Sequence, residues 1–127
     1  MNDAITGTGG IEQADYIQEG MNMQDISKAD WKLFRERIAG WQEGYMEKLN
    51  QEYIDILSGE GDASEKFWAL DERMKADKKK PGVWIELRKS ETAWNLIALI
   101  RDGAITTEDL NGFSDEIKEF VMHSIRR

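Results

Sequence analysis

The sequence lacks cysteine entirely and has one proline and one histidine among its 127 residues. Without cysteine, the chain cannot form disulfides, thiolate metal sites or a cysteine nucleophile. A single histidine, His123, cannot supply both ligands of an H-E-x-x-H zinc site. The sequence also contains no phosphate-binding glycine loop and no G-x-S-x-G elbow. We therefore predict a non-enzymatic protein with no catalytic residues, cofactor or metal ligands.

Long hydrophobic runs are also missing. No apolar stretch reaches the roughly 18 to 20 residues that cross a bilayer, and the N-terminus lacks the basic segment and apolar core of a secretory signal. We therefore expect no membrane partner and a cytoplasmic location, which the absence of cysteine also fits.

Positive charge is scarce near the N-terminus. Residues 1–30 hold six acidic residues and one lysine, so they carry five of the eight net negative charges. The same region is rich in glycine and polar residues, which bury too little apolar surface to offset the entropy of ordering. We predict a flexible acidic tail over residues 1–24 and a single helical domain over 25–127. The small net charge of that domain argues against an acidic inhibitor of a nucleic-acid-binding protein, of the anti-defence type, which remains an alternative function.

Large apolar residues recur at three- and four-residue steps between residues 27 and 57, which indicates one face of a helix. This stripe consists of Trp31, Phe34, Ile38, Trp41, Tyr45, Leu49, Tyr53 and Ile56. We predict one long helix over about 28–57, about 45 Å in length, with Ser27 and Asp30 as its N-terminal cap. Gly40 and Gly44 fall on the opposite side, where an exposed bend is favoured over close approach by a second helix.

Two helices of medium length should follow, over about 63–79 and 83–102. Asp62 and Glu65 predict a reciprocal cap for the first, whose inner face would consist of Phe67, Leu70 and Met74, with Trp68 beside them. The segment 83–102 is predicted as one helix because the chain has no second strand-like run to pair with a strand. An extended Val83–Leu87 followed by a helix from Ser90 is the competing interpretation.

A short C-terminal helical pair is predicted over about 107–111 and 115–125, which completes a small all-α bundle. The segment Asp102–Leu110, which runs into the first helix of this pair, resembles the second half of an EF-hand calcium loop. Aligning Gly103 with the loop glycine, however, places Ala98 and Ile100 at positions that require oxygen ligands. We therefore predict no calcium binding, and a helix end at Gly103 followed by a new start at Thr106.

Four segments of the sequence carry a resemblance: residues 41–59, 66–73, 77–83 and 105–117. Together they resemble a family of small bacterial helical proteins of uncharacterised function. Some members are labelled multidrug transporters, and this sequence contradicts that label because it has no stretch that could cross a membrane. The resemblance implies no activity and transfers no functional residues.

The long aromatic stripe points to a protein that binds a protein partner or associates with itself. Two shorter helices cannot cover a helix of about 45 Å from end to end, so we expect a partner at Trp31 and Phe34 or at Tyr53 and Ile56. The run Lys78, Lys79 and Lys80 is the one basic cluster, and weak nucleic-acid binding through it is a further alternative. A solvated helix end explains these lysines without any further residues and is the favoured interpretation, so nucleic acid is the less favoured partner.

Overall fold

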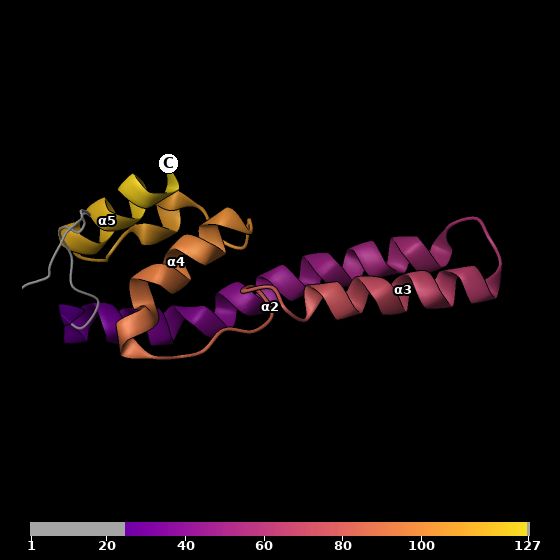
Figure 1. The fold of residues 1–127 in the computed structure, drawn as a ribbon, viewed down its shortest axis with the longest axis horizontal. Helices are drawn as coiled ribbons and strands as arrows, with labels where there is room; N and C mark the ends of the chain where they lie inside the picture. Colours follow the sequence, from indigo (N-terminus) through magenta and orange to yellow (C-terminus); the bar gives the residue numbers. More distant parts are fainter. Residues whose placement is uncertain (1–24, 127) are drawn as a thin grey trace, which may run out of the picture.

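The computed structural model describes residues 25–126, and within this range the fold is all-α without strands (Figure 1). The helices are α2 (Lys28–Ser58), α3 (Ala63–Asp77), α4 (Thr92–Arg101) and α5 (Asp115–Ile125), with 3-10 turns η2 (Lys89–Glu91) and η3 (Thr107–Leu110). The predicted small bundle of one long helix with shorter ones is confirmed. The predicted acidic tail, residues 1–24, lies outside the described residues.

Helix α2 links two parts of the molecule. In Figure 1, α4 and α5 lie over its N-terminal half and form a globular head. Helix α3 runs antiparallel along its C-terminal half, and the two helices project from the head as a hairpin. The long stripe is therefore covered in two sections, by the head and by α3.

The head contains the hydrophobic core. Phe34 and Ile38 of α2 are buried in it, and α4 and α5 supply most of the remaining side chains. The core residues are Ile26, Phe34, Ile38, Ala93, Leu96, Ile97, Leu99, Ile105, Leu110, Phe113, Ile117 and Val121. Because these groups come from segments far apart in the sequence, their burial holds the head together.

The start of α2 is fastened to the start of α5. Ser27 Oγ accepts a hydrogen bond from the Asp30 amide at 3.0 Å, which confirms the predicted cap. The Asp30 carboxylate, only 4% exposed, accepts from the Ser114 amide at 2.9 Å and from Ser114 Oγ at 2.6 Å. Asp30 therefore helps to satisfy the N-terminus of α5, a role that local spacing could not reveal.

The hairpin corrects the predicted inner face of α3. Its cap is as predicted, since the Asp62 amide donates to Glu65 Oε1 at 3.1 Å. Phe67 and Met74, however, lie exposed, and the buried residue of α3 is Asp77. A two-helix hairpin covers only a narrow line of each helix, so residues beside that line remain in solvent.

The segment between α3 and α4 also differs from the preferred prediction. Residues 83–102 do not form one helix: the chain after Pro81 turns and runs without regular structure to η2, and α4 begins only at Thr92. Thr92 Oγ1 donates to the Lys89 carbonyl at 2.8 Å. The competing interpretation, an extended segment before a shorter helix, describes this region better.

The C-terminal elements follow the predicted pair of short helices. Gly103 ends α4 with a φ of +78°, a conformation that favours glycine. The Thr106 amide then donates to Asp109 Oδ2 at 2.8 Å at the start of η3. The calcium-like segment therefore contains a helix end followed by a capped turn.

Candidate interaction surface on the helical hairpin

One side of the hairpin carries exposed apolar side chains. Ile54 and Leu57 of α2 are 52% and 48% exposed, and Phe67 and Met74 of α3 are 63% and 39% exposed. Trp68, 62% exposed, extends this surface around α3. We call these five residues the hairpin face. Isolated exposed apolar groups are common on proteins, whereas five on a two-helix projection make this surface a candidate for interaction.

Helix geometry places four residues of the hairpin face, all except Trp68, on the same side of the hairpin. Ile54 and Leu57 are three positions apart, Phe67 and Met74 are seven apart, and each pair shares one side of its helix. At about 100° per residue, each pair lies roughly a quarter turn from the α2–α3 contact line. In each helix, the pair lies on the same rotational side of this line. Because the helices are antiparallel, both pairs therefore lie on one face of the hairpin.

Phe67 and Trp68 form the largest group on this surface. Their ring centroids are 5.0 Å apart and the rings are nearly perpendicular, at 86°. Edge-to-face packing of this kind is a favoured aromatic geometry. The pair lies outside the hydrophobic core, so a large aromatic area near the hairpin tip is left without cover from the described chain.

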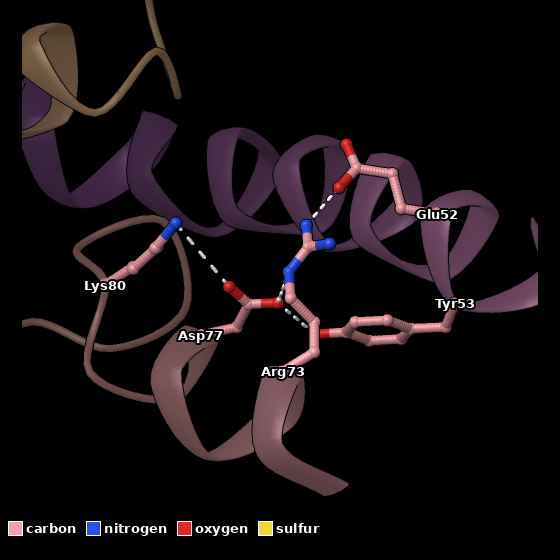
Figure 2. A network of polar contacts seen from close by, with 5 residues as sticks. All are labelled: Glu52, Tyr53, Arg73, Asp77 and Lys80. Carbon is pink, nitrogen blue, oxygen red and sulfur yellow. Dashed lines mark hydrogen bonds and ion pairs between the residues drawn. The ribbon is translucent and has the colours of Figure 1, made fainter. Parts of the chain in front are cut away.

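A polar network fixes α3 against α2 (Figure 2). The Asp77 carboxylate is 2% exposed; its Oδ2 accepts from the Tyr53 hydroxyl at 2.6 Å and from Arg73 Nε at 2.9 Å. Lys80 Nζ lies 3.6 Å from Asp77 Oδ1, and Arg73 also pairs with Glu52. A buried carboxylate requires such partners, and together they join α2, α3 and the following loop.

The network changes the acidity of its members. Burial raises the pKa of Asp77, but the Tyr53 hydrogen bond and the charges of Arg73 and Lys80 outweigh it, so the pKa lies below its ordinary value. Burial and the hydrogen bond to Asp77 raise the pKa of Tyr53 to about 12. The folded state therefore favours an ionised Asp77 and a neutral Tyr53.

The loop after α3 is held on the middle of α2. Gln42 Nε2 donates to the Pro81 carbonyl at 3.1 Å. Gly82 is buried against the Tyr45 ring, and a Cβ at this position would come within 2.3 Å of that ring. Glycine is required here because of close approach, and the contact sets where the hairpin meets the head.

The predicted partner residues at the start of the long helix lie largely inside the molecule. Phe34 is completely buried in the core, which corrects its assignment to a partner surface. Trp31 is half-buried and packs against the same core. The head therefore uses this end of the stripe for its own packing.

The predicted residues at the other end also serve the fold. Tyr53 and Ile56 are half-buried on the side of α2 that faces α3, and Tyr53 is bonded to Asp77. The prediction missed Ile54 and Leu57, which follow those two residues directly. The available signal was their position about 100° further around the helix, where apolar side chains fall outside the stripe.

The three lysines lie at the base of the hairpin. Lys78 and Lys79 are exposed, and Lys80 is half-buried beside Asp77. The structure therefore does not bring the three side chains into one equivalent basic patch, because Lys80 is engaged by the buried carboxylate.

A second exposed apolar group lies on the loop and α4. Trp84, Leu87 and Trp94 are each about half-exposed or more, and Trp94 packs edge-to-face against Phe120 with centroids 5.3 Å apart. These side chains are separate in sequence from the hairpin face.

Residues 25–126 contain no cluster of three or more histidine or acidic side chains arranged to hold a metal ion. His123 lines an open hollow along α5, together with Asp115, Lys118, Glu119, Met122 and Arg126. Among the helices of the described range, none is both long and apolar enough to span a bilayer.

Comparison with known proteins identified no relative of this chain. No protein-family model, curated protein or solved structure matches the chain. The resemblance to a bacterial family therefore stays a prediction, and the geometry of the hairpin face is the main guide to function.

Proposed function

We propose that this protein acts without catalysis, as an interaction protein that binds a protein partner through the hairpin face. The observation that carries the proposal is the exposure of Phe67 and Trp68 on a projecting hairpin whose opposite side is polar. Tryptophan and other aromatic residues often dominate binding energy at protein interfaces. A rigid helix pair also presents them with little loss of conformational entropy on binding.

The geometry of the hairpin supports recognition of an apolar helical surface. The hairpin face combines aliphatic side chains from α2 with aromatic ones from α3. A helix pair can accept another helix along its length, with side chains packing as ridges into grooves. Full burial of an exposed large apolar side chain contributes about 1.5 to 3 kcal/mol, and because these side chains are 39% to 63% exposed, covering each of them on binding contributes about half of that.

Site-specific photo-crosslinking in native cells tests the proposal. A photoreactive amino acid at position 67 would lie on the hairpin face, and one at position 48 would report the opposite side of α2, where Lys48 is exposed. We expect discrete protein adducts from position 67 and none from position 48. Equal adduct formation at both positions, or none at position 67, would contradict the proposed function.

A further inference from the structure

We infer that α2 contains a hinge at Gly40 and Gly44, about which the hairpin swings relative to the head. This inference goes beyond the proposed function, because it concerns the joint between the two parts of the molecule and holds whatever binds the hairpin face. Three features support it: where the two glycines lie, the open space around them, and the way in which the hairpin is attached to the head.

The two glycines lie where the head ends and the hairpin begins. Ile38 is the last α2 residue buried in the head core, and Trp41 is the last that packs against this core. The next buried residue of α2, Leu49, does not belong to the core of the head. Gly40 and Gly44 therefore separate the section of α2 that the head covers from the section that α3 covers.

Packing does not require glycine at either position. Both residues are exposed, and beyond its own turn of helix a Cβ on either one would meet no atom of the described residues within 4 Å. Glycine inside a helix is nevertheless less favourable than alanine, because it loses more backbone freedom on folding. Two glycines about one turn apart weaken the helix at this point, and small residues are common where helices kink.

Apart from α2 itself, the loop after α3 is the main connection between the hairpin and the head. Helix α3 makes its main contacts with α2, whereas α4 packs against α5. Between α3 and η2 the chain has no regular structure (Figure 1). Such a loop can follow a movement of the hairpin without breaking a helix, so α2 is the element that has to bend.

Tyr45 braces this hinge. Its ring packs on Gly82 of the loop, and its hydroxyl faces the Asp102 carboxylate at the end of α4. Burial and the interaction with Asp102 raise the pKa of Tyr45, so the hydroxyl stays neutral. Asp102 Oδ2 is buried without a hydrogen-bond partner among residues 25–126. An unpaired buried oxygen is unfavourable in the braced state and regains water when Tyr45 swings away, which keeps the two states close in free energy.

The hairpin is a lever of measurable length. Asp55 lies 13 residues beyond position 42, the midpoint of the two glycines, which corresponds to about 20 Å along the helix. A helix kink of about 20° would displace Asp55 by about 7 Å. Because the hairpin face moves with this section of α2, the hinge sets the direction in which that face is presented relative to the head.

Distances between two spin labels in the free, full-length chain test the hinge. Since the chain has no cysteine, Asp55→Cys on α2 and Glu119→Cys on α5 would carry the only labels, and both positions are exposed. We expect a distance distribution with a spread of about 7 Å, which narrows when Gly40→Ala and Gly44→Ala are introduced together. A wild-type distribution as narrow as that of the double alanine variant would overturn the inference.

A second label pair and a second variant serve as controls. Asp55→Cys with Glu72→Cys labels the two helices of the hairpin without spanning the glycines, so its distribution should be narrow with or without the alanines. An equally broad distribution for this pair would place the movement between α2 and α3 and overturn the hinge. Asn50→Ala, exposed on the hairpin section of α2, raises helix propensity away from the glycines. If it narrowed the spanning pair as the alanines do, the hinge position would be wrong.

Tyr45→Phe tests the brace. It keeps the ring on Gly82 but removes the hydroxyl that faces Asp102. We expect the spread of the spanning pair to increase, which is opposite in sign to the effect of the alanines. An unchanged spread would overturn the role of Tyr45 as the brace. All these measurements use the free chain, so their outcome is independent of the crosslinks obtained from position 67.

Discussion

Replacing Asp77 by asparagine should loosen the hairpin, because this carboxylate holds α2, α3 and the loop together. Asparagine retains an acceptor for the Tyr53 hydroxyl but removes the charge that faces Arg73 and Lys80. Those two side chains are 34% and 41% exposed, so solvent screens both ion pairs and each contributes up to about 1 kcal/mol. We expect a total loss of about 2 kcal/mol, once the weakened Tyr53 hydrogen bond is included.

Tyr53→Phe provides the matched comparison. It removes one hydrogen bond to a buried charged group and should cost about 1.5 to 3 kcal/mol, while the ion pairs remain. Because the two residues are in direct contact, their effects should not add: the double variant should be less destabilised than the sum by about 1 kcal/mol.

Urea denaturation followed by tryptophan fluorescence and circular dichroism would measure these free energies. Amide hydrogen exchange would show whether α3 opens before the head, as expected for a section with few buried apolar groups. Destabilisation by Asp77→Asn of less than about 0.5 kcal/mol, the range of ordinary surface substitutions, would refute the role of this network in fastening the hairpin.

Three further predictions concern other contacts and pH. Gly82→Ala should destabilise the protein by about 1 to 3 kcal/mol because its Cβ would collide with the Tyr45 ring; thermal unfolding measures the loss, and Tyr45→Ala in the same chain should remove most of the extra penalty. Asp30→Ala should cost about 1 to 3 kcal/mol in urea denaturation, since the Ser114 amide and hydroxyl lose their acceptor. Glu36→Ala, on the exposed side of α2, is the control and should be nearly neutral in the same assay. Folding lowers the pKa of Asp77, so the stability that this carboxylate contributes should be complete above about pH 4 and lost as the pH falls further. Folding raises the pKa of Tyr53 to about 12, so the stability that its hydroxyl contributes should be lost between about pH 10 and 12. Unfolding free energies measured against pH should show a smaller acid loss in Asp77→Asn and a smaller alkaline loss in Tyr53→Phe.

Local sequence signals were sufficient for most helix boundaries. Ser27 and Asp62 marked helix starts because their side chains or neighbours satisfy amides within one turn, and Gly103 marked an end because glycine readily adopts positive φ. The segment after Pro81 was misjudged. The Gln42–Pro81 hydrogen bond and the packing of Gly82 on Tyr45 hold it as an irregular loop, and both depend on residues about 40 positions away.

The periodicity of apolar residues alone could not predict the candidate surface. Apolar spacing identified Phe34 as part of a helical face, but it could not distinguish a core position from a binding position. That distinction depends on which section of α2 the head covers. Phe67 and Met74 were predicted to face inward, yet the side of α3 that packs on α2 is defined by Leu70 and the buried Asp77.

The sequence by itself determined the all-α class, the length of α2 and the position of its caps, because these follow from hydrogen bonds and side-chain periods within a few residues. Tertiary structure alone decided which apolar side chains are buried. A core needs contacts from several distant segments, and here they meet over only the first half of α2. The hairpin, with two helices, buries a single line of side chains and leaves Phe67 and Trp68 exposed.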